Sequence, residues 1–299
     1  MNIRFDGRIA VVTGAGGGLG RAHALGLAAR GASVVVNDLG RDGEPPEAAL
    51  RVVAEIETAG GRAMADGADV TRLDEVRAMA ARAEKAWGRV DILVNNAGIL
   101  SDRSFAKMDM AEFKRVVDVH LVGSANCTKA VWDGMRERNY GRIVFTSSSS
   151  GLYGNFGQAN YGAAKAAMIG LMNVLHLEGE KYGIRVNALA PMASTAMTDG
   201  LFSPDEAALL TPESVTPAVL FLVSENAPSR TILGAGAGSF AVTHIVEAPA
   251  LFLGHGEGTP EAIAARWSDL SRMDQVATLP DTFSQSRKYV AAAREQLRD

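Results

Sequence analysis

The sequence has few of the features that would place the chain outside the globular class. It holds a single cysteine, Cys127, so no disulfide can form within the chain, which fits a reducing compartment. A lone cysteine is more typical of a small buried apolar residue than of a nucleophile. The formal net charge is −4 and no long basic run is present, which argues against nucleic acid as a partner.

Long apolar runs are also missing. The first run, Ile9-Ala-Val-Val, stops at Thr13 and is too short for a signal peptide. The most apolar later stretch, Phe240 to Leu253, contains His, Glu and Pro and is too short to span a bilayer. We therefore expect no membrane segment, and we predict no metal site. Because the chain ends in Gln-Leu-Arg-Asp, which is not a peroxisomal address, we predict a cytoplasmic protein.

Glycine is abundant, with 32 residues, and it clusters directly after the first apolar run in Thr13-Gly-Ala-Gly-Gly-Gly-Leu-Gly20. A helical pattern follows, and strand, glycine turn and helix in this order are the context of a dinucleotide-binding loop. Glycines let the backbone approach a pyrophosphate, and the helix N-terminus offers it free N–H groups. The candidate cofactor residues here are Gly14, Gly18, Leu19 and Gly20, although turns of this kind without a ligand also exist.

The second expected strand ends in an acid, Asp38, which lies 18 residues after Gly20. A carboxylate at this place accepts hydrogen bonds from the adenosine ribose hydroxyls and repels a 2′-phosphate, so we predict NAD rather than NADP. Arg21 and Arg41 are close in sequence and could soften that preference. The alternative is an ordinary strand-end Asp that caps a turn.

Strands and helices alternate along the chain, which predicts an α/β fold with a doubly wound, parallel, seven-stranded sheet and helices on both faces. The expected strands are Ile9–Val12, Ser33–Asp38, Arg62–Ala68, Val90–Gly98, Gly141–Ser150, Ile184–Ala190 and one near Thr231–Leu233. The expected helices include residues 44–60, 111–138 and 160–181. We expect one domain over residues 1–299, with a C-terminal extension at 239–299 that is helical from Thr259 onward.

Tyr161 and Lys165 are four residues apart in an expected helix, so their side chains share one helix face. A phenol has a pKa of about 10 and is a poor base at neutral pH, but a nearby ammonium favours the phenolate. Such pairs also occur by chance on surface helices. The run Thr146 to Ser150 ends the fifth expected strand and delivers hydroxyls to the same sheet edge.

Taken together, these residues resemble the short-chain dehydrogenase/reductase family. The likeness rests on Thr13-Gly-x-x-x-Gly18-x-Gly20, Asp38, Asp69-Val70, Asn95-Asn-Ala-Gly98, Ser148 and Tyr161-x-x-x-Lys165. A narrower likeness is to the (3R)-hydroxyacyl-CoA dehydrogenase domain of peroxisomal multifunctional enzyme type 2. That likeness rests on Phe5-Asp-Gly-Arg8, Val34-Val-Val-Asn-Asp-Leu-Gly40, Asp102-Arg-Ser-Phe-Ala106, the run from Tyr153 to Tyr161, and Thr259-Pro-Glu-Ala262 with Trp267.

The resemblance implies roles for these residues. Tyr161 would be the general acid/base, Lys165 would hold the nicotinamide ribose and lower the pKa of the tyrosine, and Ser148 would stabilise the substrate oxygen. The cofactor residues implied in addition to the glycine turn are Asp38, Asp69, Val70, Asn96, Gly98, Tyr161 and Lys165.

Two positions depart from the family pattern. His120 stands where most of the family has an Asn in a proton relay to Lys165, and it either substitutes in that relay or simply packs nearby. Met192 follows Pro191 where the family usually has Gly, which would make that loop less permissive.

The resemblance favours an enzyme that transfers a hydride from C3 of a (3R)-hydroxyacyl-CoA, including a steroid-like or long-chain one, to NAD+. One alternative is a dehydrogenase/reductase of another secondary alcohol or ketone, such as a hydroxysteroid. A second is a non-catalytic NAD-binding regulator, against which the intact Ser148, Tyr161 and Lys165 argue. Relatives imply a homodimer, with a tetramer as the other choice.

Overall fold

The fold was taken from a computed structural model, which describes residues 2–198, 200–254, 256 and 258–296. The chain divides into two compact units, Met1–Val242 and Thr243–Asp299. The predicted residues of the candidate site all lie in the first unit. The prediction of one domain with an extension from residue 239 stays a prediction.

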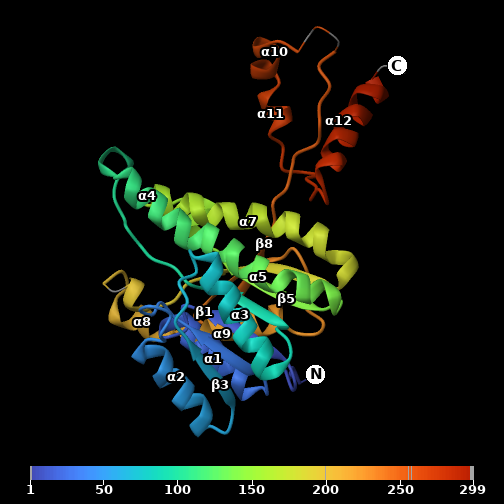
Figure 1. The fold of residues 1–299 in the computed structure, drawn as a ribbon. Helices are drawn as coiled ribbons and strands as arrows, with labels where there is room; N and C mark the ends of the chain where they lie inside the picture. Colours follow the sequence, from blue (N-terminus) through green and yellow to red (C-terminus); the bar gives the residue numbers. More distant parts are fainter. Residues whose placement is uncertain (1, 199, 255, 257, 297–299) are drawn as a thin grey trace. The chain divides into compact units, whose positions relative to one another are not determined.

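The first unit is built on one sheet with strand order β3-β2-β1-β4-β5-β6-β7-β8 (Figure 1). The pairs from β3 to β7 are parallel, and the order 3-2-1-4-5-6 confirms the predicted doubly wound topology. The strands are β1 Ile9–Thr13, β2 Ser33–Asn37, β3 Arg62–Asp66, β4 Ile92–Asn95, β5 Gly141–Thr146, β6 Ile184–Pro191, β7 Ile232–Gly236 and β8 Ser239–Thr243.

The eighth strand was not predicted. Ala237 and Gly238 join β7 to β8, and both have positive φ, at 49° and 71°. Two central residues with positive φ make the tight turn of a β-hairpin, so β8 runs back along β7. All of β8 before Thr243 is exposed, so it lacks the continuous buried apolar run by which the inner strands were recognised.

Helices cover both faces of the sheet (Figure 1). One core cluster packs apolar side chains of α1, α2 and α9 against the strands, and a second packs those of α3, α5 and α7. The helices of the first unit are α1 Gly18–Ala29, α2 Glu47–Thr58, α3 Leu73–Trp87, η1 Phe105–Lys107, α4 Met110–Val117, η2 Asp118–Val122, α5 Gly123–Glu137, α6 Ser149–Tyr153, α7 Ala159–Gly179, η3 Glu180–Tyr182, η4 Ala196–Thr198, α8 Pro204–Leu209 and α9 Pro212–Leu222.

Two expected elements are divided in the structure. The expected helix 111–138 consists of α4, one π-helical turn (η2) and α5, and such turns occur often at functional sites. The expected fifth strand ends at Thr146 instead of Ser150, because the Ser148 side chain accepts from the Ser150 N–H and starts α6 there.

The second unit is helical beyond Thr259, as predicted, but in three pieces. These are α10 Pro260–Ala265, α11 Trp267–Leu270 and α12 Thr282–Gln296. Inside this unit Lys288 Nζ forms an ion pair with Glu247 at 2.8 Å. No helix in the described part of the chain is long and apolar enough to cross a bilayer.

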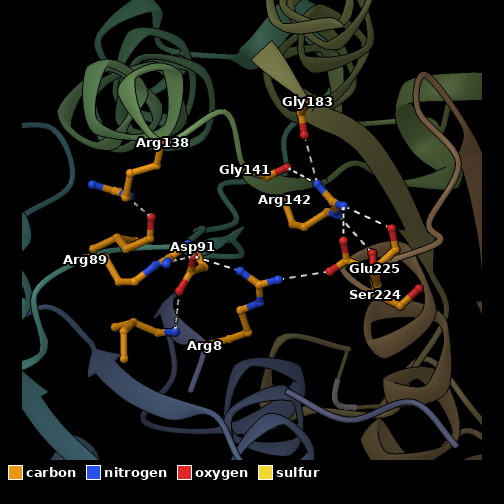
Figure 2. A network of polar contacts seen from close by, with 11 residues as sticks. Arg8, Arg89, Asp91, Arg138, Gly141, Arg142, Gly183, Ser224 and Glu225 are labelled. Atoms are coloured by element: carbon orange, nitrogen blue, oxygen red, sulfur yellow. Dashed lines mark hydrogen bonds and ion pairs between the residues drawn. The ribbon is translucent and has the colours of Figure 1, made fainter. Parts of the chain in front are cut away.

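A polar network joins the amino ends of β1, β4 and β5 (Figure 2). Asp91, which is fully buried, accepts from the Ile9 N–H at 2.9 Å and from Arg89 Nε at 2.7 Å. Arg8 lies between Asp91 and Glu225, at 3.5 Å and 3.0 Å. This network lies at the end of the sheet opposite to the carboxyl ends of the strands, where ligands bind in such folds.

Candidate active site

The glycine turn after β1 is fixed by close contacts that only glycine permits. Gly14 has φ +62°, and a Cβ there would lie 2.8 Å from Ala97 Cα. A Cβ on Gly20 would lie 2.1 Å from the Gly14 carbonyl oxygen. Gly18, with φ +49°, begins α1, and Leu19 packs against the core beneath it. The turn therefore brings the chain directly into the N-terminus of α1, as a pyrophosphate site requires.

Asp38 lies against this turn. Its carboxylate accepts from the Gly16 N–H at 2.7 Å and from the Leu39 N–H at 2.8 Å. A Cβ on Gly16 would lie 2.5 Å from Asp38 Oδ2, so the turn and the carboxylate are matched to each other. The carboxylate caps local N–H groups, as the alternative predicted, but it also faces the cavity described next.

A cavity of about 590 Å³ opens at the carboxyl ends of β1, β2 and β4. Of the predicted cofactor residues, Gly14, Asp38, Asp69, Val70 and Gly98 line it. The sequence analysis missed several lining residues. They are Asn37, Leu39, Ala68, Thr71, Ala97, Ile99, Ala111, Lys114, Arg115, Asp118 and Val119.

Four of the missed residues, 111, 114, 115 and 118, come from one face of α4 and its continuation. Their three- and four-residue spacing is the signal that could have found them, once a helix was expected there.

Asn96 does not line the cavity but supports it. Its Nδ2 donates to the carbonyls of Thr13 at 3.0 Å and Gly14 at 3.1 Å. Thr13 Oγ1 in turn accepts from the N–H groups of Asn96 and Ala97, both at 3.0 Å. These bonds tie the end of β4 to the glycine turn, so Asn96 holds the shape of the site, and its contact with a cofactor stays a prediction.

Asp69 and Val70 are held in the same way from the other side. Asp69 Oδ1 accepts from the Thr71 N–H at 2.9 Å and from Thr71 Oγ1 at 2.8 Å. The Val70 carbonyl accepts from Asn126 Nδ2 at 3.0 Å, which connects the cavity to α5.

Ser148, Tyr161 and Lys165 lie together, as predicted. Tyr161 and Lys165 are one turn apart on α7, and Lys165 Nζ lies 5.4 Å from the centroid of the tyrosine ring. The Tyr161 hydroxyl shares a hydrogen bond with Ser148, the N-cap of α6. Lys165 is buried and donates to the Thr146 carbonyl at 2.5 Å. The arrangement provides a hydroxyl pair and a cation in one place.

The direction of the Tyr161 pKa differs from the prediction. Burial raises the pKa of Tyr161 above its ordinary value of 10.0, the hydrogen bond from Ser148 offsets part of this, and the Asp102 carboxylate adds to it. Burial also lowers the pKa of Lys165 to about 7, so its ammonium loses charge near neutral pH. The lowering of the tyrosine pKa that was expected from Lys165 is therefore not found in this structure.

His120 lies in the π-helical turn and is buried against Tyr161. Its ring meets the Tyr161 ring edge-on, with centroids 5.1 Å apart and planes at 86°. Nε2 lies 2.8 Å from the Ile99 carbonyl oxygen, and Nδ1 has no partner among the described residues. Burial, with a smaller effect of the Lys165 charge, lowers the pKa of His120 to about 3. The imidazole is therefore neutral at physiological pH.

Gly98 is required by His120. A Cβ on Gly98 would lie 2.2 Å from His120 Cε1, closer than atoms can approach. Met192, by contrast, is not in the left-handed region of backbone conformation, so the family's usual glycine is not needed there for φ.

Similar proteins extend this picture. Mouse peroxisomal multifunctional enzyme type 2 is 50% identical over 228 residues, which are 75% of this chain and 31% of that protein. The solved structure of the full-length enzyme of that name from Drosophila melanogaster has a TM-score of 0.82 and 38% identity, covering 99% of this chain and 51% of that one. A 7α-hydroxysteroid dehydrogenase in complex with NADH and 7-oxo-glycochenodeoxycholic acid has a TM-score of 0.72 and 34% identity, covering 80% of this chain and 96% of that one.

The names of these relatives correct one prediction. The first curated relatives that the chain matches are named peroxisomal enzymes, so the assignment to the cytoplasm is wrong. Its error was to treat one missing terminal signal as evidence of location. The chain spans about a third of the length of these first relatives.

The family match covers the part of the chain that contains the candidate site. The sequence model described as short chain dehydrogenase matches residues 8–206. That range holds the glycine turn, Asp38, Ser148, Tyr161 and Lys165 on a sheet of the predicted topology. The chain belongs to the short-chain dehydrogenase family and is an oxidoreductase that acts on CH–OH groups.

Proposed function

We propose that the protein is an NAD-dependent dehydrogenase of (3R)-hydroxyacyl-CoA thioesters. The observation that carries this proposal is the 50% identity with mouse peroxisomal multifunctional enzyme type 2. The sequence resembles the dehydrogenase domain of that enzyme class over nearly its whole length. The fold alone would not support such a substrate, because this fold hosts many alcohols.

In the proposed reaction Tyr161 exchanges a proton with the C3 oxygen of the substrate. For oxidation the phenolate accepts the hydroxyl proton while the C3–O bond becomes a carbonyl, and for reduction the phenol returns that proton. NAD+ bound in the cavity would supply the acceptor for the hydride that leaves C3. When substrate is bound, Ser148 turns its single O–H from Tyr161 to the same substrate oxygen and stabilises charge that develops there.

The raised pKa of Tyr161 gives the two directions different pH dependences. At neutral pH the residue is a phenol, which is the form that reduction needs. Oxidation needs the phenolate, so its rate should rise as the pH increases above neutral. Lys165, whose pKa is about 7, carries its charge mainly below neutral pH.

The cavity fits a dinucleotide, and its charges favour NAD. The glycine turn leaves no room for a Cβ at Gly14 or Gly20, which is the close backbone approach that a pyrophosphate needs. Asp38 would accept from the ribose hydroxyls. Arg21, which could have met a 2′-phosphate, is instead paired with Glu55, and Arg41 is almost fully exposed beside Asp42.

Cofactor choice is tested by titrating NADH and NADPH into Asp38→Ala, with binding followed by fluorescence. We expect a loss of NADH affinity of about tenfold or more, because the hydrogen bonds from the ribose hydroxyls to the Asp38 carboxylate are lost. The loss for NADPH should be smaller, because the substitution also removes the repulsion between this carboxylate and the 2′-phosphate. Asp42→Ala, at an exposed position, is the matched control. Tighter binding of NADPH than NADH by the unmodified protein would refute the NAD assignment.

The substrate is tested by NADH production from (3R)- and (3S)-hydroxyacyl-CoA thioesters of different chain length beside free hydroxysteroids. We expect turnover of the (3R) thioesters. Tyr161→Phe should abolish that turnover while NADH binding persists, and Tyr182→Phe, at a half-buried residue in η3 outside the site, should not. Full activity of Tyr161→Phe would refute the mechanism.

A hydroxysteroid is the second candidate substrate. It is favoured by the similarity to the 7α-hydroxysteroid dehydrogenase, which extends over 80% of this chain. Turnover of free hydroxysteroids without turnover of any thioester would select it. A homodimer, or a tetramer, stays a prediction that light scattering can check.

A further inference from the structure

The side chain of Gln158 joins three segments beside the catalytic residues. Its Nε2 donates to Asp102 Oδ2 at 2.8 Å, in the loop that follows β4. Its Oε1 accepts from Ser150 Oγ at 2.8 Å and from Asn155 Nδ2 at 3.2 Å. Gln158 is 9% exposed, so these bonds are made largely away from water.

The orientation of this amide is set by its neighbours. A carboxylate can only accept, so the NH₂ group must face Asp102 and the carbonyl must face the hydroxyl of Ser150. Turning the amide over would place two acceptors against each other at one end. Gln158 therefore links the loop after β4 to α6 with one defined geometry.

The Ser150 end of the link leads to the catalytic residues. The Ser150 N–H donates to Ser148 Oγ at 3.2 Å, in the cap of α6. The backbone carbonyl of Gln158 accepts from the Gly162 N–H at 2.7 Å, which fixes the main chain of residue 158 to the turn of α7 that carries Tyr161. A displacement of the Gln158 side chain would thus reach the Ser148 hydroxyl through Ser150, and the Tyr161 hydroxyl through its hydrogen bond with Ser148.

Two further bonds hold the same segments together. The Arg103 N–H donates to the Gly157 carbonyl at 2.8 Å, and the buried Asn160 donates from Nδ2 to the Ser101 carbonyl at 2.9 Å. These bonds keep the backbones in place when the Gln158 side chain is changed. A conservative substitution should therefore disturb the local geometry without unfolding the protein.

We propose that Gln158, through its bond to Asp102, is a positioning residue of the dehydrogenase reaction that holds the Ser148 and Tyr161 hydroxyls in register. It does not touch the reacting atoms itself. The inference rests on one part of the proposed function, that a secondary alcohol is oxidised at this site. It does not depend on which alcohol is the substrate. A misplacement of about 1 Å at a reacting group can cost about 100-fold in rate.

The test exchanges the amide and the carboxylate across the bond between Gln158 and Asp102. Gln158→Glu sets two carboxylates against each other and should lower kcat by about 10- to 100-fold. Asp102→Asn keeps an acceptor for the Gln158 NH₂ and should stay within about threefold of the unmodified enzyme. The double variant restores an amide–carboxylate bond with the partners exchanged, and it should recover most of the lost kcat.

Three readouts separate positioning from general damage. kcat and KM are measured with the best substrate of the panel, NADH affinity by fluorescence, and hydrogen exchange over residues 148–162 by mass spectrometry. We expect NADH affinity to change less than about threefold, while exchange rises in Gln158→Glu and falls again in the double variant. The exchange measurement needs no substrate, so it remains informative if the thioester assignment fails.

Two results would overturn the inference. One is an unchanged kcat and unchanged exchange in Gln158→Glu. The other is equal impairment of Gln158→Glu and the double variant, since the bond to Asp102 would then not matter. If the enzyme oxidised another alcohol and no thioester, and the variants changed kcat as expected, the thioester proposal would be wrong and the positioning role of Gln158 would still hold.

Discussion

Two carboxylates contact Arg8 in the network at the amino ends of the strands, and they should differ greatly in their effect on stability (Figure 2). The side chain of Asp91 is fully buried, whereas that of Glu225 is 67% exposed. Exposed ion pairs stabilise proteins by about 0–1 kcal/mol, because water solvates both partners well when they separate. Removing one partner of a buried pair costs about 3–5 kcal/mol.

Asp91→Asn keeps the shape of the side chain but removes its charge. The new amide can accept from only one side, so either the Ile9 N–H or the Arg89 Nε–H faces another donor. The side chains of Arg8 and Arg89 are 27% and 34% exposed and can recover some hydration. We therefore expect the lower end of the range, a loss of about 3 kcal/mol. Glu225→Gln should lose less than about 1 kcal/mol.

Urea unfolding followed by far-ultraviolet circular dichroism measures this difference. Both substitutions lie in the same unit, so the same transition is compared. Turnover at a temperature where both variants are folded should equal that of the unmodified enzyme. Equal losses of stability in the two variants would refute the argument that burial decides the strength of these contacts.

Two further predictions concern buried histidines. Gly98→Ala would press a methyl group against His120 and should cost about 1–3 kcal/mol by overpacking, seen as a lower unfolding midpoint, while Gly170→Ala, with open space around it, should not. Burial lowers the pKa of His23 to about 3, so the unfolded chain takes up the proton first, and below about pH 6.5 His23 should contribute about 1.4 kcal/mol per pH unit to the fall in stability, beside an equal contribution from His120, whose pKa burial also lowers to about 3. Urea midpoints at pH 7 and pH 5 measure this slope, and an unchanged slope in His23→Gln would contradict it.

The sheet was predictable because its inner strands are buried on both faces. Every residue of β1 and β2 is buried, so in the sequence these strands appear as short, continuous apolar runs. An amphipathic helix would instead alternate apolar and polar residues along its turns. The strand β8 carries no such buried run, since one side of it has no neighbouring strand in the described sheet order. Strand ends were harder to place. At Thr146 the end depends on the capping bond of Ser148 and not on hydrophobicity.

The residues of the candidate site were predictable where the chemistry demands a particular residue type at a particular spacing. Glycine at 14 and 20, the acid at 38 and the Tyr161–Lys165 pair belong to this class. Gln158 does not, because its importance comes from partners 8 and 56 residues away that meet only in the folded chain. The direction of the Tyr161 pKa was missed for a similar reason, since burial outweighs the charge that the spacing placed nearby.

The two ends of β4 show how the molecule separates stability from chemistry. Asp91 directly precedes the strand and anchors Arg8 and Arg89, while Asn95 and Asn96 end it beside the glycine turn. A four-residue strand, Ile92–Asn95, lies between these groups, and it is fully buried and held by parallel neighbours on both sides. Packed strands of this kind deform little, so a charge lost at the amino end should weaken the fold without moving the turn at the carboxyl end. If Asp91→Asn lowered NADH affinity under conditions where the variant is fully folded, β4 would carry the structural change from its amino end to the glycine turn, and the two ends would act as one unit.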